Sequence, residues 1–411
     1  MRRLKIVTLW YPPEQAAFGV MMQELAAHLK DRGWDVEIVT SLPSHPRGIV
    51  FEGWSGRIGR SEEDGLPVRR LRTMISCRRG ALSRGIAQLS FSVTAMRDVL
   101  FGRRAEVVVA PLQPLFLGPL LGLACRVRRS SLVWLVQDIH PDALVDLGLL
   151  REGLLVRMLR WCERVGYRTG ARIISICPAF ARHVTTRQGG RTDGRSVVIR
   201  NWCRPSVLAE TMEKSACRAK LDLPADGILL LYAGTLSYSS NASLLIDVAR
   251  RLRDSAPEIR VVVVGEGPLR GDFDREVRLG GASNLIIRDF VPADMLSCLL
   301  GAADIAAVTM DPTSARNSLP SKSISYLGAG IPVVADCPEG SPLHEELSEA
   351  GAARFAAPAD PDAFAGSVVE LAKSEEDRRR LGDSGRDFVK RELVAEVVLP
   401  KYAEILEGIA R

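Results

Sequence analysis

The chain has 411 residues, of which 46% are hydrophobic, and a formal net charge of +6. This length exceeds one ordinary core and predicts two domains of roughly 200 residues each. The longest apolar run, Leu112 to Cys125, contains Gln113, Pro114 and Pro119, whereas a bilayer span needs about 18 to 20 apolar residues. We expect no transmembrane helix, and with no nucleic-acid reader module visible we expect no nucleic-acid partner.

The N-terminus and the cysteines both favour a cytoplasmic protein. The apolar stretch after Lys5 is followed at once by Trp10–Glu14, so it is too short for a signal peptide and predicts a first buried strand. The eight cysteines are scattered, without a Cys-x-x-Cys motif or His pairs at ligand spacing. This pattern favours free thiols in a reducing cytosol over a zinc site.

Strands and helices are predicted to alternate through the first half of the chain. A strand at Lys5–Thr8 leads to an amphipathic helix from about Val20 to Arg32 and then to a second strand. The later strands are predicted at Val36–Thr40, Val107–Ala110, Leu132–Val136, Ile173–Ile176 and Val197–Ile199. This alternation is typical of a parallel sheet covered on both faces, and it predicts a Rossmann-like domain.

The second half repeats this pattern after a polar, charge-rich segment at about Pro205 to Pro224, which we interpret as a linker. Strands are predicted from Ile228, at Arg260–Val264 and at Leu285–Arg288, with helices near Ala242–Ser255 and Ala293–Ala302. The predicted fold class is α/β, with two Rossmann-like, doubly wound domains that face a cleft. We expect domains at 1–205 and 206–393, and a helix at 394–411 that packs back on the first domain.

The segment from Asp304 to Asp336 reads as strand, loop, helix and strand. In an open parallel sheet, such a unit points its loop and helix N-terminus at the ligand crevice beyond the carboxyl ends of the strands. Backbone N–H groups and the helix dipole favour phosphate there. Pro320 and Ser321 lie in this loop, and Lys322 adds a cation where a diphosphate would lie.

Two glycine loops follow strands of the same half. One is Gly234-Thr235-Leu236-Ser237 and the other is Gly265-Glu266-Gly267. Either loop alone can be a tight turn or can bring backbone close to a ligand. In combination with the loop before Lys322, they are expected to lie along one carboxyl edge, where doubly wound sheets bind ligands.

The first half offers two candidate sites. Phe18 and Gly19 follow a loop that leads into a helix, so the first-turn amides can receive an anionic group or can be purely structural. Asp138 and His140 follow the strand Leu132–Val136 and are the only such titratable pair near the expected cleft in this half. A catalytic or substrate role and a helix-capping role for Asp138 both remain open.

Arginine is concentrated between Arg69 and Arg104, where the only carboxylate is Asp98. Aliphatic residues are interleaved from Ala81 to Phe101. Such a basic amphipathic face can rest on an anionic membrane surface, which would place the protein peripherally at the inner face of the plasma membrane. A solvated, arginine-rich helix is the alternative.

Several motifs together resemble the family 4 glycosyltransferases of the GT-B fold. The resemblance covers nearly the whole chain. It is carried by Tyr11-Pro12-Pro13, Arg32-Gly33-Trp34-Asp35-Val36, Asn201-Trp202, Tyr232-Ala233-Gly234, Val264-Gly265-Glu266-Gly267-Pro268, Ala303-Asp304 and Gly330-Ile331-Pro332-Val333-Val334. Pro43–Gly48, Val136–Pro141 and Pro320-Ser321-Lys322 are most similar to the bacterial surface-polysaccharide branch, which includes fucosamine and colanic-acid-type transferases.

The resemblance implies a retaining transferase that uses a nucleoside diphosphate sugar and a lipid-linked or oligosaccharide acceptor. No cofactor is expected, and no metal, because no Asp-x-Asp occurs near either cleft edge. We expect Lys322 to stabilise the departing diphosphate, and Asp138, His140 and Lys322 are the catalytic candidates. Phe18, Gly19 and His45 are then the acceptor-binding candidates. The donor-binding candidates are Gly234, Thr235, Ser237, Gly265, Glu266, Asn317, Pro320, Ser321, Lys322 and Ser325.

This chain departs from the family pattern at the donor site. Asn317 and Ser325 stand where many relatives carry glutamates, and Thr235 with Ser240 or Asn241 replaces the usual Arg and Lys. Gln137 replaces a common His. Two alternatives therefore stay open: a nucleotide-sugar 2-epimerase, which shares the fold, and a non-catalytic GT-B partner or scaffold.

Overall fold

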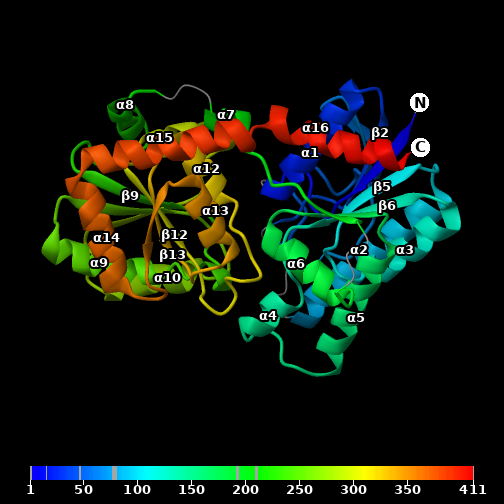
Figure 1. The fold of residues 1–411 in the computed structure, drawn as a ribbon, viewed down its shortest axis with the longest axis horizontal. Helices are drawn as coiled ribbons and strands as arrows, with labels where there is room; N and C mark the ends of the chain where they lie inside the picture. Colours follow the sequence, from blue (N-terminus) through cyan, green and yellow to red (C-terminus); the bar gives the residue numbers. More distant parts are fainter. Residues whose placement is uncertain are drawn as a thin grey trace. The chain divides into compact units, whose positions relative to one another are not determined.

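The computed structural model describes residues 2–14, 16–45, 48–75, 81–190, 194–208 and 212–410. The chain separates into two compact units, shown as a ribbon in Figure 1. The first unit consists of Met1–Val145, Leu150–Arg200 and Leu399–Arg411, and the second of Asp146–Leu149 and Asn201–Val398. None of the helices in the described ranges combines the length and the apolar character that a membrane span requires.

The first unit is built on an eight-stranded sheet in the order β3-β4-β2-β1-β5-β6-β7-β8. All neighbours are parallel except β3 and β4, which pair antiparallel. The strands are β1 (Arg3–Val7), β2 (Asp35–Thr40), β3 (Gly59–Glu63), β4 (Leu66–Arg70), β5 (Val107–Pro111), β6 (Ser131–Val136), β7 (Arg172–Ser175) and β8 (Ser196–Val198).

Helices connect these strands and cover the sheet (Figure 1). They are α1 (Ala17–Asp31), α2 (Ala81–Phe101), α3 (Leu117–Arg128), α4 (Asp142–Asp146), α5 (Leu154–Thr169) and α6 (Pro178–Arg187). The end of α16 (Ala395–Ile409) also belongs to this unit, where Glu407 forms an ion pair of 3.0 Å with Arg32, the residue that follows α1.

The second unit contains a six-stranded, all-parallel sheet in the order β11-β10-β9-β12-β13-β14. Its strands are β9 (Ile228–Ala233), β10 (Ile259–Val264), β11 (Leu285–Arg288), β12 (Ile305–Thr309), β13 (Val333–Asp336) and β14 (Ala353–Ala356). Its helices are α7 (Pro205–Leu208), α8 (Lys214–Lys220), η1 (Tyr238–Ser240), α9 (Leu244–Ser255), α10 (Arg270–Leu279), η2 (Ala293–Met295), α11 (Leu296–Gly301), α12 (Lys322–Ala329), α13 (Pro342–Ala350), α14 (Pro361–Lys373) and α15 (Glu375–Glu392).

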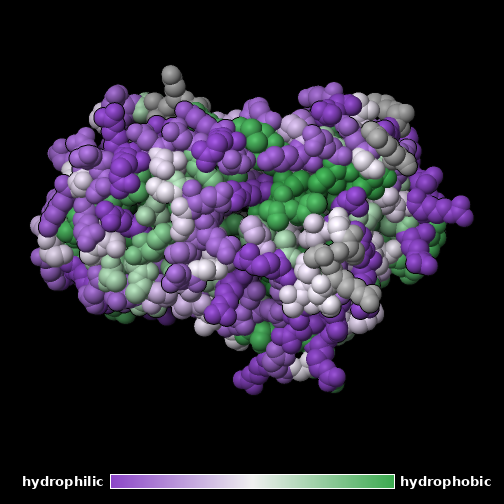
Figure 2. Space-filling model, viewed as in Figure 1, coloured by the Kyte–Doolittle hydropathy of each residue, from purple (hydrophilic) through white to green (hydrophobic). Residues whose placement is uncertain are grey.

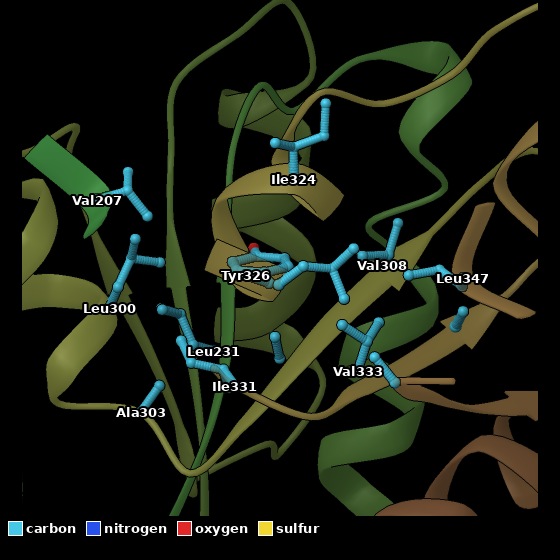
Figure 3. Packing of buried hydrophobic residues seen from close by; sticks show 14 of the residues in the cluster. Val207, Leu231, Leu300, Ala303, Val308, Ile324, Tyr326, Ile331, Val333 and Leu347 are labelled. Carbon is cyan, nitrogen blue, oxygen red and sulfur yellow. The ribbon is translucent and has the colours of Figure 1, made fainter. Parts of the chain in front are cut away.

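Side-chain alternation along β9 explains why the second sheet carries helices on both faces. Leu229 and Leu231 belong to one buried cluster, and Leu230 and Tyr232 belong to the other. Successive side chains of a strand point to opposite faces, so a strand that is apolar throughout needs a covering layer on each side. Figure 3 shows the first cluster, with Tyr326 of α12 lying among Leu231, Val308 and Val333.

Two parts of this architecture differ from the sequence prediction. The hairpin β3–β4 was not expected, although Asp64 and Gly65 between its strands both have positive φ, of 49° and 72°. Asp-Gly between strands is a common signal for a two-residue hairpin. The expected linker at 205–224 contains α7 and α8, and Arg218 of α8 is buried and donates a 2.6 Å hydrogen bond to Asp304. That segment is therefore part of the second unit's packing.

Candidate active site

The strand order of the second sheet identifies its ligand-binding edge. The chain runs outward from β9 through β10 to β11 and then returns to β12 on the opposite side of β9. Such a reversal is a topological switch point, and open α/β sheets bind ligands beyond the carboxyl ends of the two strands that flank it. The loop after β9 begins at Gly234, and the loop after β12 leads to Lys322.

Lys322 reaches this edge from the first residue of α12. Its Nζ lies 3.5 Å from the centroid of the Tyr232 ring. Tyr232 belongs to the buried cluster on one face of the sheet, whereas Tyr326, which lies on α12 with Lys322, belongs to the cluster on the other face. The side chain passes directly over Gly234, where an added Cβ would lie 2.9 Å from the Lys322 Cε. Gly234 therefore leaves the space through which the amine reaches the switch point.

The Lys322 amine is an unusual group in its surroundings. Its Nζ is buried and has no hydrogen-bond partner among the described residues, even though the residue as a whole is only partly buried. Burial lowers the pKa of Lys322 well below its usual value, because desolvation penalises the charged form. The face of Tyr232 favours a cation but does not replace hydrogen-bond acceptors. An anionic group at this position would supply them.

Tyr326 and Ser323 fix the helix that carries Lys322. The Tyr326 hydroxyl accepts a 2.7 Å hydrogen bond from the Ala233 N–H at the end of β9, and it lies 3.3 Å from the Ala233 carbonyl oxygen. Ser323 donates a 2.7 Å hydrogen bond to the buried carboxylate of Glu346. No local sequence pattern indicates these roles, because the contacts join elements that are far apart in the chain.

Gly265 and Gly267 bring the loops after β9 and β10 into direct backbone contact. An added Cβ at Gly265 would lie 2.0 Å from the Gly234 carbonyl oxygen, and one at Gly267 would lie 2.4 Å from that of Leu236. The Leu236 N–H donates a 2.9 Å hydrogen bond to the Glu266 carbonyl. The prediction that these glycine loops lie along one edge is confirmed, and both glycines of the second loop serve close backbone packing.

The other donor-binding candidates near β9 and β10 lie in this loop pair. Thr235 is exposed, and its carbonyl accepts a 3.0 Å hydrogen bond from the Tyr232 hydroxyl. Ser237 caps η1, and its N–H donates to the Ser240 Oγ at 3.1 Å. Glu266 lies 3.5 Å from Arg270, which ties its carboxylate to α10.

The loop after β12 carries the remaining donor candidates. The Asn317 N–H donates to the Ser314 carbonyl at 2.9 Å, and the Pro320 carbonyl accepts a 2.9 Å bond from Ser323. Ser321 occupies the N-cap position of α12 without a side-chain capping bond and is exposed. Ser325 is partly buried on α12, one turn after Lys322.

In the first unit, Glu14 organises the loops that follow β1 and β2. Its buried carboxylate accepts hydrogen bonds from the N–H groups of Tyr11, Ser44 and His45, at 3.1, 2.8 and 2.7 Å. Burial raises the pKa of Glu14, while these three bonds lower it. The loop that contains His45 is thus held against the loop that contains Trp10, and the two rings lie 5.0 Å apart.

Phe18 and Gly19 lie in the first turn of α1, beside the same loop. An added Cβ at Gly19 would lie 2.8 Å from the Trp10 carbonyl oxygen, so this glycine allows close packing of the loop on the helix. Phe18 is partly buried. Gly19 therefore lies beside the loop that carries the Trp10–His45 pair, which contains the third acceptor candidate.

Asp138 and His140 follow β6, as predicted. The Asp138 carbonyl accepts a 3.3 Å bond from the Gln113 side chain, which comes from the loop after β5. The His140 Nδ1 is buried without a hydrogen-bond partner in the described part of the chain, and burial lowers the pKa of His140 to about 4. Near neutral pH this imidazole is therefore uncharged, because burial disfavours its protonated form.

The arginine-rich segment is only partly available to an external partner. Arg69 pairs with the buried Asp98, Arg70 is itself buried and bonds to Glu63, and Arg103 lies 3.7 Å from Asp35. Arg104 donates to the carbonyls of Arg128 and Arg129. Arg78 and Arg79 lie outside the described residues. The prediction of a basic amphipathic face between Arg69 and Arg104 did not anticipate these contacts.

Possible metal ligands and free cysteines both occur among the described residues. No group of three or more His, Cys, Asp or Glu side chains within them is arranged to hold a metal ion. Seven cysteines are buried free thiols, namely Cys125, Cys162, Cys177, Cys203, Cys217, Cys298 and Cys337. Cys77 lies outside the described ranges.

Solved structures share this architecture over the whole chain. Sucrose-phosphate synthase from Thermosynechococcus elongatus matches with a TM-score of 0.77 and 15% identity, covering 100% of this chain and 99% of that one. WaaG, a glycosyltransferase involved in lipopolysaccharide biosynthesis, matches with a TM-score of 0.70 and 13% identity over 99% of this chain and 100% of its own. Anabaena HepE in complex with UDP and glucose has a TM-score of 0.71 and 17% identity, covering 98% of this chain and 99% of that one.

Curated relatives and family models agree with the fold. WcaI of Escherichia coli K12, assigned as a colanic acid biosynthesis glycosyl transferase, is 24% identical over 78% of this chain and 79% of its own length. The glycosyltransferase WbjE of Pseudomonas aeruginosa is 24% identical over 78% of this chain and 80% of its own. Residues 17–202 match the model of the glycosyl transferase 4-like domain, and residues 227–374 match that of the glycosyl transferases group 1. The chain therefore belongs to the family 4 type of glycosyltransferases and has the GT-B fold.

Proposed function

We propose that the protein is a retaining glycosyltransferase that binds a nucleoside diphosphate sugar at the switch point of the second unit. The observation that carries this proposal is the buried Lys322 amine, which has no hydrogen-bond acceptor among the described residues and lies between Gly234 and Tyr232. A diphosphate placed there accepts hydrogen bonds from the Lys322 ammonium group and from the first backbone N–H groups of α12. A developing negative charge on the leaving group is stabilised by such fixed groups.

The acceptor is proposed to bind the first unit, at the loops that carry Trp10, Phe18, Gly19 and His45. We propose a lipid-linked or oligosaccharide acceptor in bacterial surface-polysaccharide assembly. The relatives assigned to colanic acid and lipopolysaccharide biosynthesis support this class. Asp138 and His140 are proposed to contact the sugar or the acceptor, because both follow the carboxyl end of β6 and the buried His140 Nδ1 has no hydrogen-bond partner among the described residues.

The test is thermal unfolding with UDP, GDP and dTDP in separate samples. A nucleotide at about 100 times its dissociation constant stabilises the folded state by roughly 2.7 kcal/mol, which is readily measured. Lys322→Met should weaken binding of the selected nucleotide by about 1.5 to 3 kcal/mol, the range of a charge-assisted contact. Lys220→Met, at an exposed lysine of α8, is the matched control.

The outcomes separate this proposal from its rivals. A shift with one nucleotide that Lys322→Met reduces, and that Lys220→Met does not, supports the transferase. No shift with any nucleotide would favour a non-catalytic role. Conversion of a UDP-sugar to its epimer without an acceptor would favour the epimerase, and retention of the anomeric configuration in the product tests the stereochemistry.

A further inference from the structure

The solvent-facing side of α5 in the first unit is apolar. Leu154 is 81% exposed, Leu155 53%, Met158 42% and Trp161 52%. Leu154, Met158 and Trp161 are spaced i, i+4 and i+7, so they form one stripe along the helix. Most of the face drawn in Figure 2 is hydrophilic, apart from a hydrophobic patch in its upper right part.

The inward side of the same helix explains why this stripe points outward. Val156, Glu163 and Tyr167 are buried, and the Glu163 carboxylate bonds to the Tyr167 hydroxyl at 3.0 Å and to the His183 Nε2 at 2.8 Å. These contacts fix the rotation of α5 about its axis. The helix therefore presents its large apolar residues to solvent and its only carboxylate to the interior.

Arginines flank the stripe. Arg157, Arg164 and Arg168 are exposed, and within the described ranges no carboxylate pairs with any of the three side chains. Arg160 is the exception on this helix, since it forms ion pairs with Asp142 and Glu152. The outward face of α5 thus combines Leu, Met and Trp side chains with uncompensated positive charge.

We infer that α5 is a docking face for an anionic lipid surface, with Leu154, Met158 and Trp161 entering the headgroup boundary and Arg157, Arg164 and Arg168 meeting lipid phosphates. A basic amphipathic helix with Trp and Leu on its apolar side binds membrane interfaces in this way. The arginine stems lie along the apolar boundary while their guanidinium groups reach the headgroups. A second copy of the chain is a poorer occupant, because a symmetric contact would bring these arginines together without carboxylates.

This docking face differs from the arginine-rich segment identified in the sequence. That segment includes α2, whose Ile86 and Leu89 are also exposed, at 44% and 42%. However, several of its arginines are already held by Asp98, Glu63 and Asp35. The inference does not rest on the proposed reaction, since binding to lipid needs neither donor nor acceptor.

The test is co-sedimentation of the full chain with vesicles of phosphatidylglycerol and phosphatidylcholine, compared with pure phosphatidylcholine, at low and high salt. Arg157→Gln with Arg168→Gln should reduce binding to the anionic vesicles about 30-fold, from the contribution of each arginine near such a surface. The double variant Leu154→Gln with Trp161→Gln should reduce binding to the anionic vesicles by a similar factor. Ile86→Gln with Leu89→Gln on α2 is the matched control and should bind as the unchanged chain does.

Circular dichroism and the thermal midpoint of each variant confirm that it is folded, and nucleotide binding reports the proposed active site separately. Salt-sensitive binding that is lost only in the α5 variants supports the inference. It is overturned if the unchanged chain does not sediment with anionic vesicles at low salt, or if the α5 variants bind normally. Self-association in light scattering that the α5 variants abolish, without lipid binding, would assign the face to a second copy instead.

Discussion

The Nζ of Lys322 and the ring of Tyr232 lie 3.5 Å apart across the carboxyl end of β9. The two residues come from opposite faces of the sheet, and they meet only because Gly234 has no side chain. A buried amine over an aromatic ring, at the point where the strand order reverses, is the strongest chemical feature of the second unit.

Nucleotide binding should be accompanied by proton uptake at Lys322. Burial lowers the amine pKa in the free protein, and an adjacent diphosphate raises it by favouring the charged form. Between these two pKa values, binding takes up a proton, so affinity falls as pH rises. Calorimetry in buffers of different ionisation enthalpy measures this uptake, and Lys322→Met should abolish it. A buffer-independent enthalpy for the unchanged chain at every pH tested below the usual pKa of lysine would contradict the prediction.

Gly234→Ala should impair nucleotide binding without unfolding the protein. The added Cβ meets only the flexible end of Lys322, at 2.9 Å from Cε and 3.0 Å from Nζ, so the amine is displaced, and the Gly234 φ of 158° adds some backbone strain. We expect a loss of affinity similar to that of Lys322→Met, with a smaller loss of stability than that of Gly265→Ala. Gly271→Ala is the control, because nothing lies within 4 Å of its Cβ position.

Gly265→Ala should destabilise the second unit instead. Here the Cβ would lie 2.0 Å from a backbone oxygen, that of Gly234, and two strand-ending loops would have to move apart. Overpacking of this kind costs about 1 to 3 kcal/mol. Thermal unfolding without ligand measures the effect, and a midpoint equal to that of Gly271→Ala would show that the loops separate freely.

Tyr326→Phe should also lower stability. The change removes the hydroxyl that accepts the 2.7 Å bond from the Ala233 N–H and leaves that donor without its partner. An unsatisfied buried group of this kind costs about 1 to 3 kcal/mol. The comparison is with Tyr238→Phe, since Tyr238 is 49% exposed. If the two variants unfold at the same temperature, the Ala233 contact contributes little.

Glu14→Ala should weaken binding of the acceptor and leave binding of the donor nucleotide unchanged. The carboxylate holds the N–H groups of Ser44, His45 and Tyr11, so its loss frees the loops that carry the Trp10–His45 pair. We expect the KM for the acceptor to rise about tenfold or more, from the loss of charge-assisted bonds. The thermal shift caused by nucleotide should not change. An unchanged acceptor KM would remove these loops from the acceptor site.

Asp336 should make stability depend on pH between about 4 and 6. Burial raises its pKa from 3.8 to about 6 in the folded state, so the folded state binds more protons than the unfolded state in this window. Stability therefore falls as pH rises through it, by up to about 3 kcal/mol, and levels off above it. Asp336→Asn should remove this dependence. Unfolding at several pH values with both proteins would refute the assignment if their difference stayed constant.

The positions of the main strands and of the loop before Lys322 could be predicted, because they depend on local patterns. Uninterrupted apolar runs such as Val261–Val264 indicate strands buried on both faces, and the segment Asp304–Asp336 has the predicted strand, loop, helix and strand. The family resemblance was also carried by contiguous motifs. Each of these signals lies within a few residues of chain.

The contacts that shape the site could not be predicted, because they join residues far apart in the sequence. Tyr326 and Ala233 are 93 residues apart, and nothing near either residue indicates the other. The glycines were assigned to turns or ligand approach, whereas Gly265 makes room for the backbone of Gly234. The apolar stripe of α5 was missed for a different reason. A hydrophobic pattern reveals that a helix is amphipathic, but only tertiary packing determines which side faces solvent.

The first unit is discontinuous in sequence, since residues 399–411 belong with residues 1–145 and 150–200. The Arg32–Glu407 ion pair joins the two ends of this arrangement. A gene fragment that stops at residue 200 would thus encode an incomplete module, and its missing helix would have to be added in trans. A hybrid with a relative therefore cannot be made by joining two halves at a single point in the chain. An intact hybrid needs a second junction, before residue 399, so that the last helical turns come from the same protein as the rest of the first unit.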